Sequence, residues 1–257
     1  MVVIGDLHCG HIVGLTPGRY QWNPRKGDAR RRRIARMQRE CWDFYRETVK
    51  RLKPVDIAVV NGDCIDGRGE KSGGLELITV NRHEQCEMAV ECIKLMDAKH
   101  VIITMGTPYH VGERESYEDS IARMIGARIG AHLFPEVNGV VFDVRHHIGG
   151  SSVPYGRSTA ITRAHVWNLL IAERGKQPKA DITLRSHVHF HAGAFSSDWI
   201  GMTLPTLQAA GTRFGALKCS GDIDYGLVHF DIDEKGGYTW QAHIAVLVSE
   251  RARTIRL

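Results

Sequence analysis

The sequence lacks long hydrophobic runs. No stretch approaches the roughly 18 consecutive apolar residues that a membrane-spanning helix requires. The first residues also lack the basic segment followed by an apolar one that marks a secretory leader. These absences argue against a membrane protein and against a secreted one. We therefore expect a cytoplasmic protein that has no membrane partner.

The sequence also lacks paired cysteines. It has no CxxC motif and no spacing typical of a disulfide framework. In a chain of this length the cysteines are expected to be reduced thiols packed in the core. Two of them, Cys9 and Cys64, lie next to residues that we assign to a metal below, but we favour packing over ligation for both. The six are Cys9, Cys41, Cys64, Cys86, Cys92 and Cys219.

The overall composition is that of a soluble globular protein, with 43% apolar and 25% charged residues. No repeat, low-complexity segment or linker divides the chain, so we expect one domain over residues 1–257. Short apolar runs alternate with longer segments of helical period, which is typical of an α/β fold. The expected strands are 2–4, 55–60, 101–105, 140–147 and 182–189, with antiparallel strands near 203–210, 226–233 and 238–247. The expected helices are 29–52, 77–97, 115–132 and 159–173.

Carboxylates and imidazoles follow several of the expected strands. They are Asp6 and His8, Asp63 and Asp66, His110, His146 and His147, and His187 and His189. Ligands of open α/β sheets bind beyond the carboxyl ends of the strands, so these side chains are expected to converge. Residues two apart in a strand face the same way. Asp6 and His8 should therefore bind at one site, and so should His187 and His189.

The residue types indicate a transition-metal site. Carboxylate oxygen and neutral imidazole nitrogen suit Mn²⁺, Fe, Zn²⁺ or Co²⁺, whereas a site rich in histidine is a poor one for Ca²⁺ or Mg²⁺ alone. Two carboxylates and at least four histidines exceed what one tetrahedral ion needs. They suit two ions that share a bridging aspartate.

In this order the motifs resemble those of the calcineurin-like metallophosphoesterases. GDLH (5–8), GDCID (62–66), a histidine at 146 or 147 before a glycine pair, and SHVH (186–189) stand where that family has D-x-H, GDxxD, a lone histidine and GHxH. The resemblance covers most of the chain, from Gly5 to His189. It implies a four-layer α/β/β/α sandwich with mixed sheets. It also implies a dinuclear metal centre that hydrolyses phosphate esters through a metal-activated hydroxide.

The resemblance implies a role for each matching residue. Asp6 and His8 would hold the first metal ion, and Asp63 would bridge both ions. His187 would bind the second ion and His189 the first. The expected cofactor is a pair of divalent ions, with Mn²⁺ favoured over Fe, Zn²⁺, Co²⁺ and Mg²⁺.

One histidine of the adjacent pair 146/147 would complete the second site. Neighbouring residues in a strand face opposite ways, so only one of the two can point inward. The sequence does not choose between them. We keep both His146 and His147 as candidate ligands, with a slight preference for His147 because it is nearer the glycine pair.

The chain departs from the family where the family has GNH. The sequence there is GTPYH, so Thr107 takes the position of the asparagine ligand and the histidine is displaced by two residues to His110. Either His110 acts as acid or ligand, or the second ion is held more loosely. We assign His110 and Asp63 as catalytic and Thr107 as substrate-binding; a packed loop histidine is the alternative for His110. Arg114 and Arg145 are further candidates for phosphate contact, although we favour a solvated or helix-capping role for each.

The positive charge is concentrated in one segment. Residues 25–39 carry eight Arg or Lys and one Asp. Such clusters bind nucleic-acid phosphates, although a solvated helix face or a subunit contact would look the same. Four arginines at a helix start oppose the helix dipole, which argues for a compensating partner. Candidate substrate-binding residues are therefore Arg30, Arg31, Arg32 and Arg33, with DNA or RNA as the partner.

Three functions remain open. The favoured one is a metal-dependent phosphodiesterase that acts on nucleic acid. The second is a phosphomonoesterase acting on small nucleotides or phosphoproteins. The third is a scaffold that keeps the fold without catalysis, which the altered GTPYH motif supports. Against the scaffold, buried carboxylates and imidazoles without a metal are costly to fold.

Overall fold

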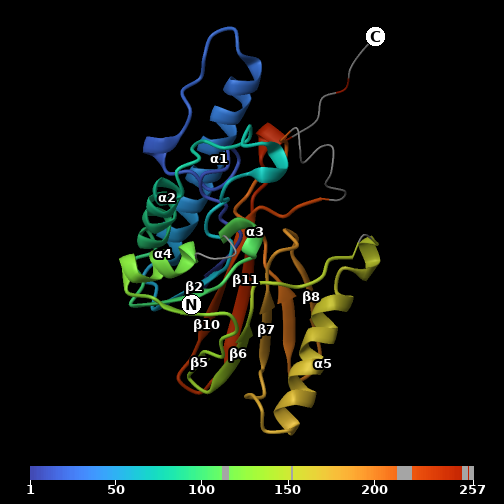
Figure 1. Cartoon of the computed structure of the whole chain (residues 1–257). Coiled ribbons are helices and arrows are strands. Elements are labelled where there is room, and N and C mark those ends of the chain that lie inside the picture. The colour runs from blue at the N-terminus through green and yellow to red at the C-terminus, as the bar shows by residue number, and fades with distance from the viewer. Residues whose placement is uncertain (112–115, 152, 213–221, 251–253, 255–257) are drawn as a thin grey trace.

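The computed structural model describes the chain except residues 112–115, 152, 213–221, 251–253 and 255–257. Within the described residues, two mixed β-sheets face each other (Figure 1). The first sheet has the order β11 (Tyr238–Ile244), β10 (Gly226–Ile232), β1 (Val2–Ile4), β2 (Ile57–Asn61), β3 (His100–Thr104) and β4 (Arg128–Gly130). The second has the order β5 (Glu136–Val137), β6 (Val140–Val144), β7 (Ile182–Arg185), β9 (Ile200–Thr203) and β8 (Ala192–Phe195).

Parallel strands form the centre of both sheets. Strands β1 to β4 run parallel to one another. Strand β10 pairs antiparallel with β1, and β11 pairs antiparallel with β10. Strands β6, β7 and β9 are also parallel, flanked by antiparallel β5 and β8. The carboxyl ends of β1, β2 and β3 therefore lie at one edge, and those of β6 and β7 lie at the same edge of the second sheet.

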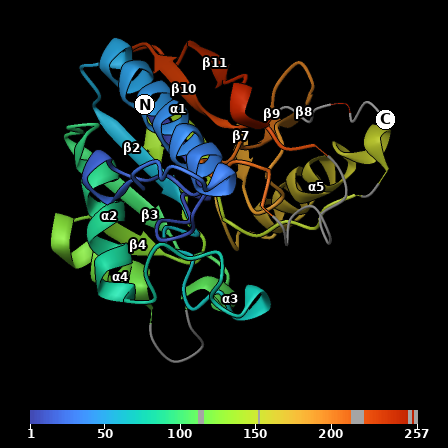
Figure 2. The ribbon, with the colours of Figure 1, turned by 90° about the horizontal axis from the view of Figure 1, so that it is seen from above.

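Helices cover the outer face of each sheet. In Figures 1 and 2, α1 (Ala29–Leu52), α2 (Arg82–Lys94) and α4 (Tyr117–Ile125) lie against the first sheet, and α5 (Thr159–Glu173) lies against the second. The short α3 (Pro108–Val111) follows β3. Single 3₁₀ turns are η1 (Gly18–Tyr20), η2 (Glu70–Ser72), η3 (Pro154–Gly156) and η4 (Val248–Glu250). The layers thus run helix, sheet, sheet, helix, so the expected four-layer sandwich is confirmed.

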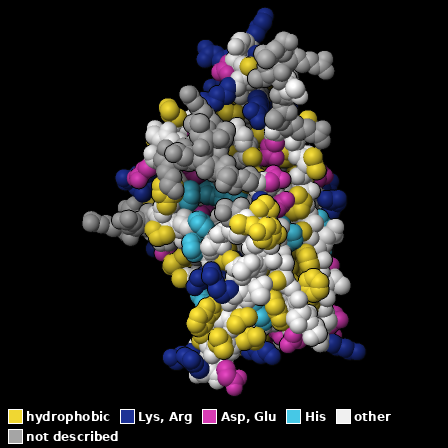
Figure 3. All heavy atoms as spheres, turned by 90° about the vertical axis from the view of Figure 1, so that its right-hand side faces the viewer, with side chains coloured by type: hydrophobic (Ala, Val, Ile, Leu, Met, Phe, Trp, Pro, Cys, Tyr) yellow, Lys and Arg dark blue, Asp and Glu magenta, His cyan; other side chains and the backbone are white. Residues whose placement is uncertain are grey.

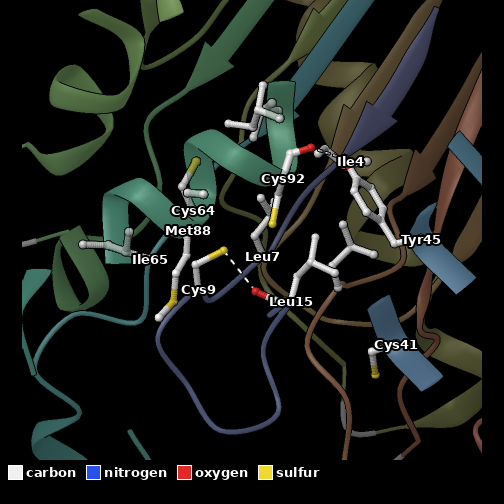
Figure 4. Close-up of a cluster of buried hydrophobic side chains, with 14 of the residues drawn as sticks. Ile4, Leu7, Cys9, Leu15, Cys41, Tyr45, Cys64, Ile65, Met88 and Cys92 are labelled. Carbon is white, nitrogen blue, oxygen red and sulfur yellow. Dashed lines mark hydrogen bonds between the residues drawn. The ribbon is translucent and has the colours of Figure 1, made fainter. Parts of the chain in front are cut away.

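Two apolar clusters hold these layers together. The inner one fills the space between the sheets with side chains such as Val3, Phe142 and Phe230. The outer one joins the first sheet to α1, α2 and α4, and Figure 4 shows part of it around Tyr45 and Met88. Five cysteines are buried free thiols of this chain, namely Cys9, Cys41, Cys64, Cys86 and Cys92; Cys219 lies outside the described residues.

Local sequence explains where α1 begins and why it packs on the sheet. The Asp28 side chain accepts a hydrogen bond from the Arg31 N–H at 2.8 Å, which caps the helix. Buried residues then recur at helical spacing, at Ile34, Met37, Cys41, Tyr45 and Val49. The observed bounds match the expected helix 29–52.

Other expected elements are longer than the observed ones. The third helix ends at Ile125 because Gly126 adopts a left-handed conformation, with φ of 70°. Strands β6 and β7 end at Val144 and Arg185, so the histidines expected in these strands lie in the turns that follow them. Of the strand expected near 203–210, only Thr203 lies in a strand, at the end of β9, which pairs in parallel with β7 and antiparallel with β8.

Among the described residues, no helix combines the length and the apolar character that crossing a membrane demands.

Candidate metal centre

The predicted ligands sit on tight turns just past the strands. Five of them have positive φ: Asp6 (50°), His8 (44°), Asp63 (49°), His187 (74°) and His189 (59°). Elsewhere in the described part of the chain, two other non-glycine residues have positive φ, Asp97 and Asn138. Residues other than glycine rarely adopt this backbone conformation. It persists where surrounding contacts enforce it, often at functional sites. The backbone conformation of these turns, and not the alternation of a strand, therefore determines where these side chains point.

Hydrogen bonds between the turns hold them together. The Asp6 N–H donates to Gly62 O at 3.1 Å, and the His8 N–H donates to Asp63 O at 3.0 Å. The Asp6 carboxylate in turn accepts from the His187 N–H at 3.1 Å. The turns after β1, β2 and β7 thus form one connected unit.

Glycine is required at position 62 of the GDCID motif. Its φ is +76°, and a Cβ there would lie 2.4 Å from His146 Nδ1. A larger residue would therefore displace the histidine that the site contains. The glycine of this motif serves the packing of the ligand shell as well as the turn.

The structure gathers the candidate ligands into three groups whose ligand atoms lie within 4.8 Å of one another. The first is Asp6, His8 and His189; the second is Asp63, His146 and His187; the third is His8, Asp63 and His110. Asp63 belongs to the second and third groups and His8 to the first and third, so these two residues link the groups to one another. His187 and His189 fall into different groups, so they do not grip one site together as expected from their spacing.

Aspartate oxygens lie at the centre of the groups. Asp6 Oδ1 is 3.4 Å from His189 Nε2, 3.9 Å from His8 Nε2 and 3.9 Å from His146 Nε2. Asp63 Oδ2 is 3.1 Å from His146 Nε2 and 4.0 Å from His110 Nε2. These separations are those of ligand atoms that surround an ion.

Two atoms of this cluster are buried without a hydrogen-bond partner. They are Asp6 Oδ1 and His146 Nε2, on residues that are 0% and 1% exposed. The nearest opposite groups, His189 Nε2 at 3.4 Å and Asp63 Oδ2 at 3.1 Å, are ion-pair contacts without hydrogen-bond geometry. Leaving a buried polar atom unsatisfied costs about 1–3 kcal/mol, and such atoms need an explanation. Carboxylate oxygen and imidazole nitrogen are ligands for divalent transition metals. A metal ion is the partner that fits both atoms.

The charge states of the histidines fit this interpretation. Burial, with His110 nearby, lowers the pKa of His8 to about 4, and burial with His146 nearby lowers that of His187 to about 4. Both imidazoles are therefore neutral at pH 7 and offer a lone pair. His146 differs, because Asp63 and Asp6 outweigh its burial and raise its pKa to about 10. In the metal-free protein its positive charge balances the two carboxylates.

The structure chooses between the two adjacent histidines. His146 is 1% exposed and belongs to the second group, while His147 is exposed and touches the cluster through its ring, 4.7 Å from the His187 ring. The preference for His147 is therefore corrected in favour of His146. The position relative to the glycine pair was a poor guide, because the turn after β6 buries every second residue from Val144 to Ile148.

The GTPYH segment supports the cluster in two ways. The Thr107 N–H and hydroxyl donate to Asp63 Oδ1 at 2.7 and 3.1 Å, so the threonine orients the carboxylate. His110 Nδ1 lies 3.1 Å from Asp66 O, and its ring packs edge-on against His8, with 4.4 Å between the centroids. The displaced histidine thus returns to the site. Asp66 Oδ1 also lies 3.1 Å from His8 Nδ1, which fixes the orientation of that ligand.

One buried acid near the cluster carries no signal in the sequence. Glu118, in the first turn of α4, is fully buried, and burial followed by the charge of Asp63 raises its pKa to about 8. Its contacts are backbone N–H groups of Cys64 and Gly106, 54 and 12 residues away in the chain. No motif spacing links these positions.

The basic segment lies at the start of α1, away from the ligand groups. Arg30, Arg32 and Arg33 are exposed, and the Arg31 guanidinium lies over the Trp22 ring, 4.9 Å from its centroid. In Figure 3, Lys and Arg side chains lie at the upper end of the face and also at its sides and lower end, and histidines lie midway down. Arg145 is exposed next to the site, and Arg114 lies outside the described residues.

Two mixed sheets are enclosed by helices, and the histidine and aspartate groups lie at the carboxyl ends of their strands. This is the four-layer arrangement that the resemblance to the calcineurin-like metallophosphoesterases implies. No protein-family model matches the chain, and no curated protein matches it either.

Several solved structures align with nearly the whole chain at low identity. An archaeal phosphodiesterase is 13% identical and covers 94% of this chain and 98% of its own, with a TM-score of 0.45. Vacuolar protein sorting 29 from Cryptosporidium parvum is 12% identical, covering 95% and 96%, with a TM-score of 0.48. A predicted phosphoesterase from Streptococcus pneumoniae is 12% identical, covering 94% and 96%, with a TM-score of 0.36.

Proposed function

We propose that this chain is a metal-dependent phosphodiesterase that acts on nucleic acid and holds two divalent metal ions, of which Mn²⁺ is the first candidate. The observation that supports it most is the convergence of buried, unsatisfied Asp6 Oδ1 and His146 Nε2 with neutral imidazoles at the strand ends. Divalent ions bound there would neutralise phosphate oxygens and lower the pKa of a water molecule. Fe, Zn²⁺, Co²⁺ and Mg²⁺ are the other candidates.

The two ligand sets follow from the groups. Asp6, His8 and His189 would hold one ion, and His146 with His187 would hold the other. The Asp63 carboxylate would be common to both sets. The Thr107 N–H donates to its Oδ1, and the Thr107 hydroxyl lies within hydrogen-bond distance of both of its oxygens, so the threonine fixes the orientation of this carboxylate.

His110 is the proposed acid that protonates the leaving oxygen. Its Nδ1 is held by Asp66 O at 3.1 Å, which directs Nε2 toward Asp63. Its side chain is 18% exposed, whereas those of His8 and His146 are 2% and 1% exposed, so His110 reaches solvent and substrate more readily than the buried ligands do. A positioned imidazole can supply a proton at neutral pH.

The ester hydrolysed is proposed to be a phosphodiester. The first test compares bis-p-nitrophenyl phosphate with p-nitrophenyl phosphate, using metal-stripped protein to which Mn²⁺ is added. Asp63→Asn is the control, because asparagine tolerates the left-handed backbone of this position (φ 49°) and so removes a charged ligand without added strain. We expect diester turnover that requires metal and is lost in Asp63→Asn. Turnover of the monoester alone would instead identify a phosphomonoesterase.

Nucleic acid is the proposed substrate because of the arginines at the start of α1. Arg30 and Arg32 are both exposed, although the Arg32 guanidinium also donates to Arg25 O at 3.3 Å. Each phosphate contact contributes about 0.9 to the slope of log affinity against log salt on duplex DNA. We expect the double variant Arg30→Ala/Arg32→Ala to bind DNA and RNA more weakly. The slope of its log affinity against log salt should be smaller in magnitude by up to about 2.

The matched control removes two positive charges elsewhere. Arg174 and Lys176 are exposed just beyond α5, and the double alanine variant at these positions should bind as the wild type does. Binding is measured by fluorescence anisotropy between 50 and 300 mM salt. Equal salt slopes in the two double variants would remove the arginine segment from the proposed substrate surface.

A further inference from the structure

A single buried carboxyl group connects two of the turns that build the ligand cluster. Glu118 is 0% exposed, and its two oxygens accept hydrogen bonds from different segments. Oε2 accepts from the Gly106 N–H at 2.8 Å, and Oε1 accepts from the Cys64 N–H at 3.3 Å. The acceptor lies in the first turn of α4, on the helix side of the first sheet.

Both turns that Glu118 holds carry groups that orient Asp63. Cys64 is the next residue along the chain from Asp63. Gly106 precedes Thr107, whose N–H and hydroxyl both donate to the Asp63 carboxylate. A displacement of either turn would therefore move Asp63 or its hydrogen-bond donors.

The space around this carboxylate is closed. A Cβ at Gly106 would lie 2.2 Å from Asp63 Oδ1 and 2.7 Å from Glu118 Oε1. The turn can neither shift toward the cluster nor accept a larger residue. Removal of the Glu118 carboxylate would leave two buried N–H groups without an acceptor, which the turns can relieve by moving.

We propose that Glu118 is a positioning residue for the metal centre: it sets the location of Asp63 through the Cys64 and Gly106 N–H groups. This inference rests on the metal binding of the proposed function and not on its catalysis. Metal binding is measured without any substrate, so the inference and the proposed catalysis can fail separately.

The test compares Glu118→Ala with a matched buried polar residue from the other side of the sandwich. Asn168, on α5, is 1% exposed and likewise accepts from a backbone N–H, that of Ala180, at 2.9 Å. Mn²⁺ binding to stripped protein is measured by calorimetry, the Co²⁺ derivative by its visible absorption spectrum, and stability by urea unfolding. Both alanine variants should lose stability.

Glu118→Ala alone should lose metal affinity. Residues that support metal ligands typically change affinity 10- to 100-fold when they are replaced, so we expect at least a 10-fold weaker Mn²⁺ affinity and an altered Co²⁺ spectrum. Glu118→Gln retains one carbonyl acceptor and should lose less than Glu118→Ala. Asn168→Ala should bind Mn²⁺ within twofold of the wild type.

Equal Mn²⁺ affinities for Glu118→Ala and Asn168→Ala would overturn the inference, since Glu118 would then serve stability alone. If Glu118→Ala does not fold, Glu118→Gln decides the matter by the same comparison. A wild type that binds no Mn²⁺ would also overturn it, because there would be no centre to position. A wild type that binds Mn²⁺ without cleaving any ester would refute the proposed function and leave this inference standing.

Discussion

Replacement of His146 or His147 by alanine separates a buried ligand from its exposed neighbour. His146 Nε2 lies 3.1 Å from Asp63 Oδ2 and 3.9 Å from Asp6 Oδ1, and its Nδ1 lies 2.7 Å from Asn61 O. In the metal-free protein these carboxylates hold its pKa at about 10, so it is protonated at pH 7. Removing one partner of a buried ion pair costs about 3–5 kcal/mol. His146→Ala should therefore lower the free energy of unfolding by about that amount.

The same change in the exposed neighbour should have little effect. Surface substitutions usually stay within about 0.5 kcal/mol, and His147 is exposed. Because the pKa of His146 is raised in the folded state, its contribution is complete below its usual pKa of about 6.5 and fades as pH rises toward 10. The difference between the two variants should therefore be larger at pH 6 than at pH 10.

The assay is urea unfolding of metal-stripped protein at these two pH values, followed by measurement of bound Mn²⁺ per chain by mass spectrometry. We expect about two ions in the wild type and in His147→Ala, and no more than one in His146→Ala. The reasoning is refuted if His146→Ala loses less than about 1 kcal/mol, or if His147→Ala loses stability or metal to the same extent.

Two further substitutions test the packing around the site and under the second sheet. Asp143→Asn should cost about 3–5 kcal/mol at pH 7, because it leaves the buried Arg185 guanidinium, 2.7 Å from Asp143 Oδ1, without its charge partner. Despite burial, His132 and Arg185 lower the pKa of Asp143, so its contribution is present above about pH 3.9 and is lost below; urea unfolding between pH 3 and 7 should show a flatter acid dependence in the variant. Gly106→Ala should destabilise the protein by about 1–3 kcal/mol and weaken Mn²⁺ binding, because its Cβ would lie 2.2 Å from Asp63 Oδ1. Gly18→Ala, with open space around it, is the control, and equal effects on thermal stability and calorimetric binding would contradict the packing explanation.

Much of the fold could be predicted from the sequence because its signals are local. Each buried parallel strand is a short apolar run, such as VDIAVV (55–60). The long amphipathic helix is predicted by the spacing of Ile34, Met37 and Cys41. The alternation of such segments predicts an α/β fold, and the family resemblance implies its four-layer sandwich; the structure confirms both. Element ends were less predictable, since the turn conformation of Gly126 and of the ligand residues ends helices and strands before the apolar pattern does.

The candidate ligands could be named from the sequence for the same reason: Asp6, His8 and Asp63 directly follow the strands that carry them. Which atoms meet was decided by contacts between distant segments. His146 faces the cluster, and not His147, because the turn after β6 packs against Gly62. Glu118 joins it because α4 places a carboxylate beneath two turns far away in the chain. The sequence by itself determined the strands, the helices and the chemistry at their ends, because these depend on neighbouring residues; the tertiary structure alone decided which side chains share a site, because burial and hydrogen bonding are properties of the assembled turns.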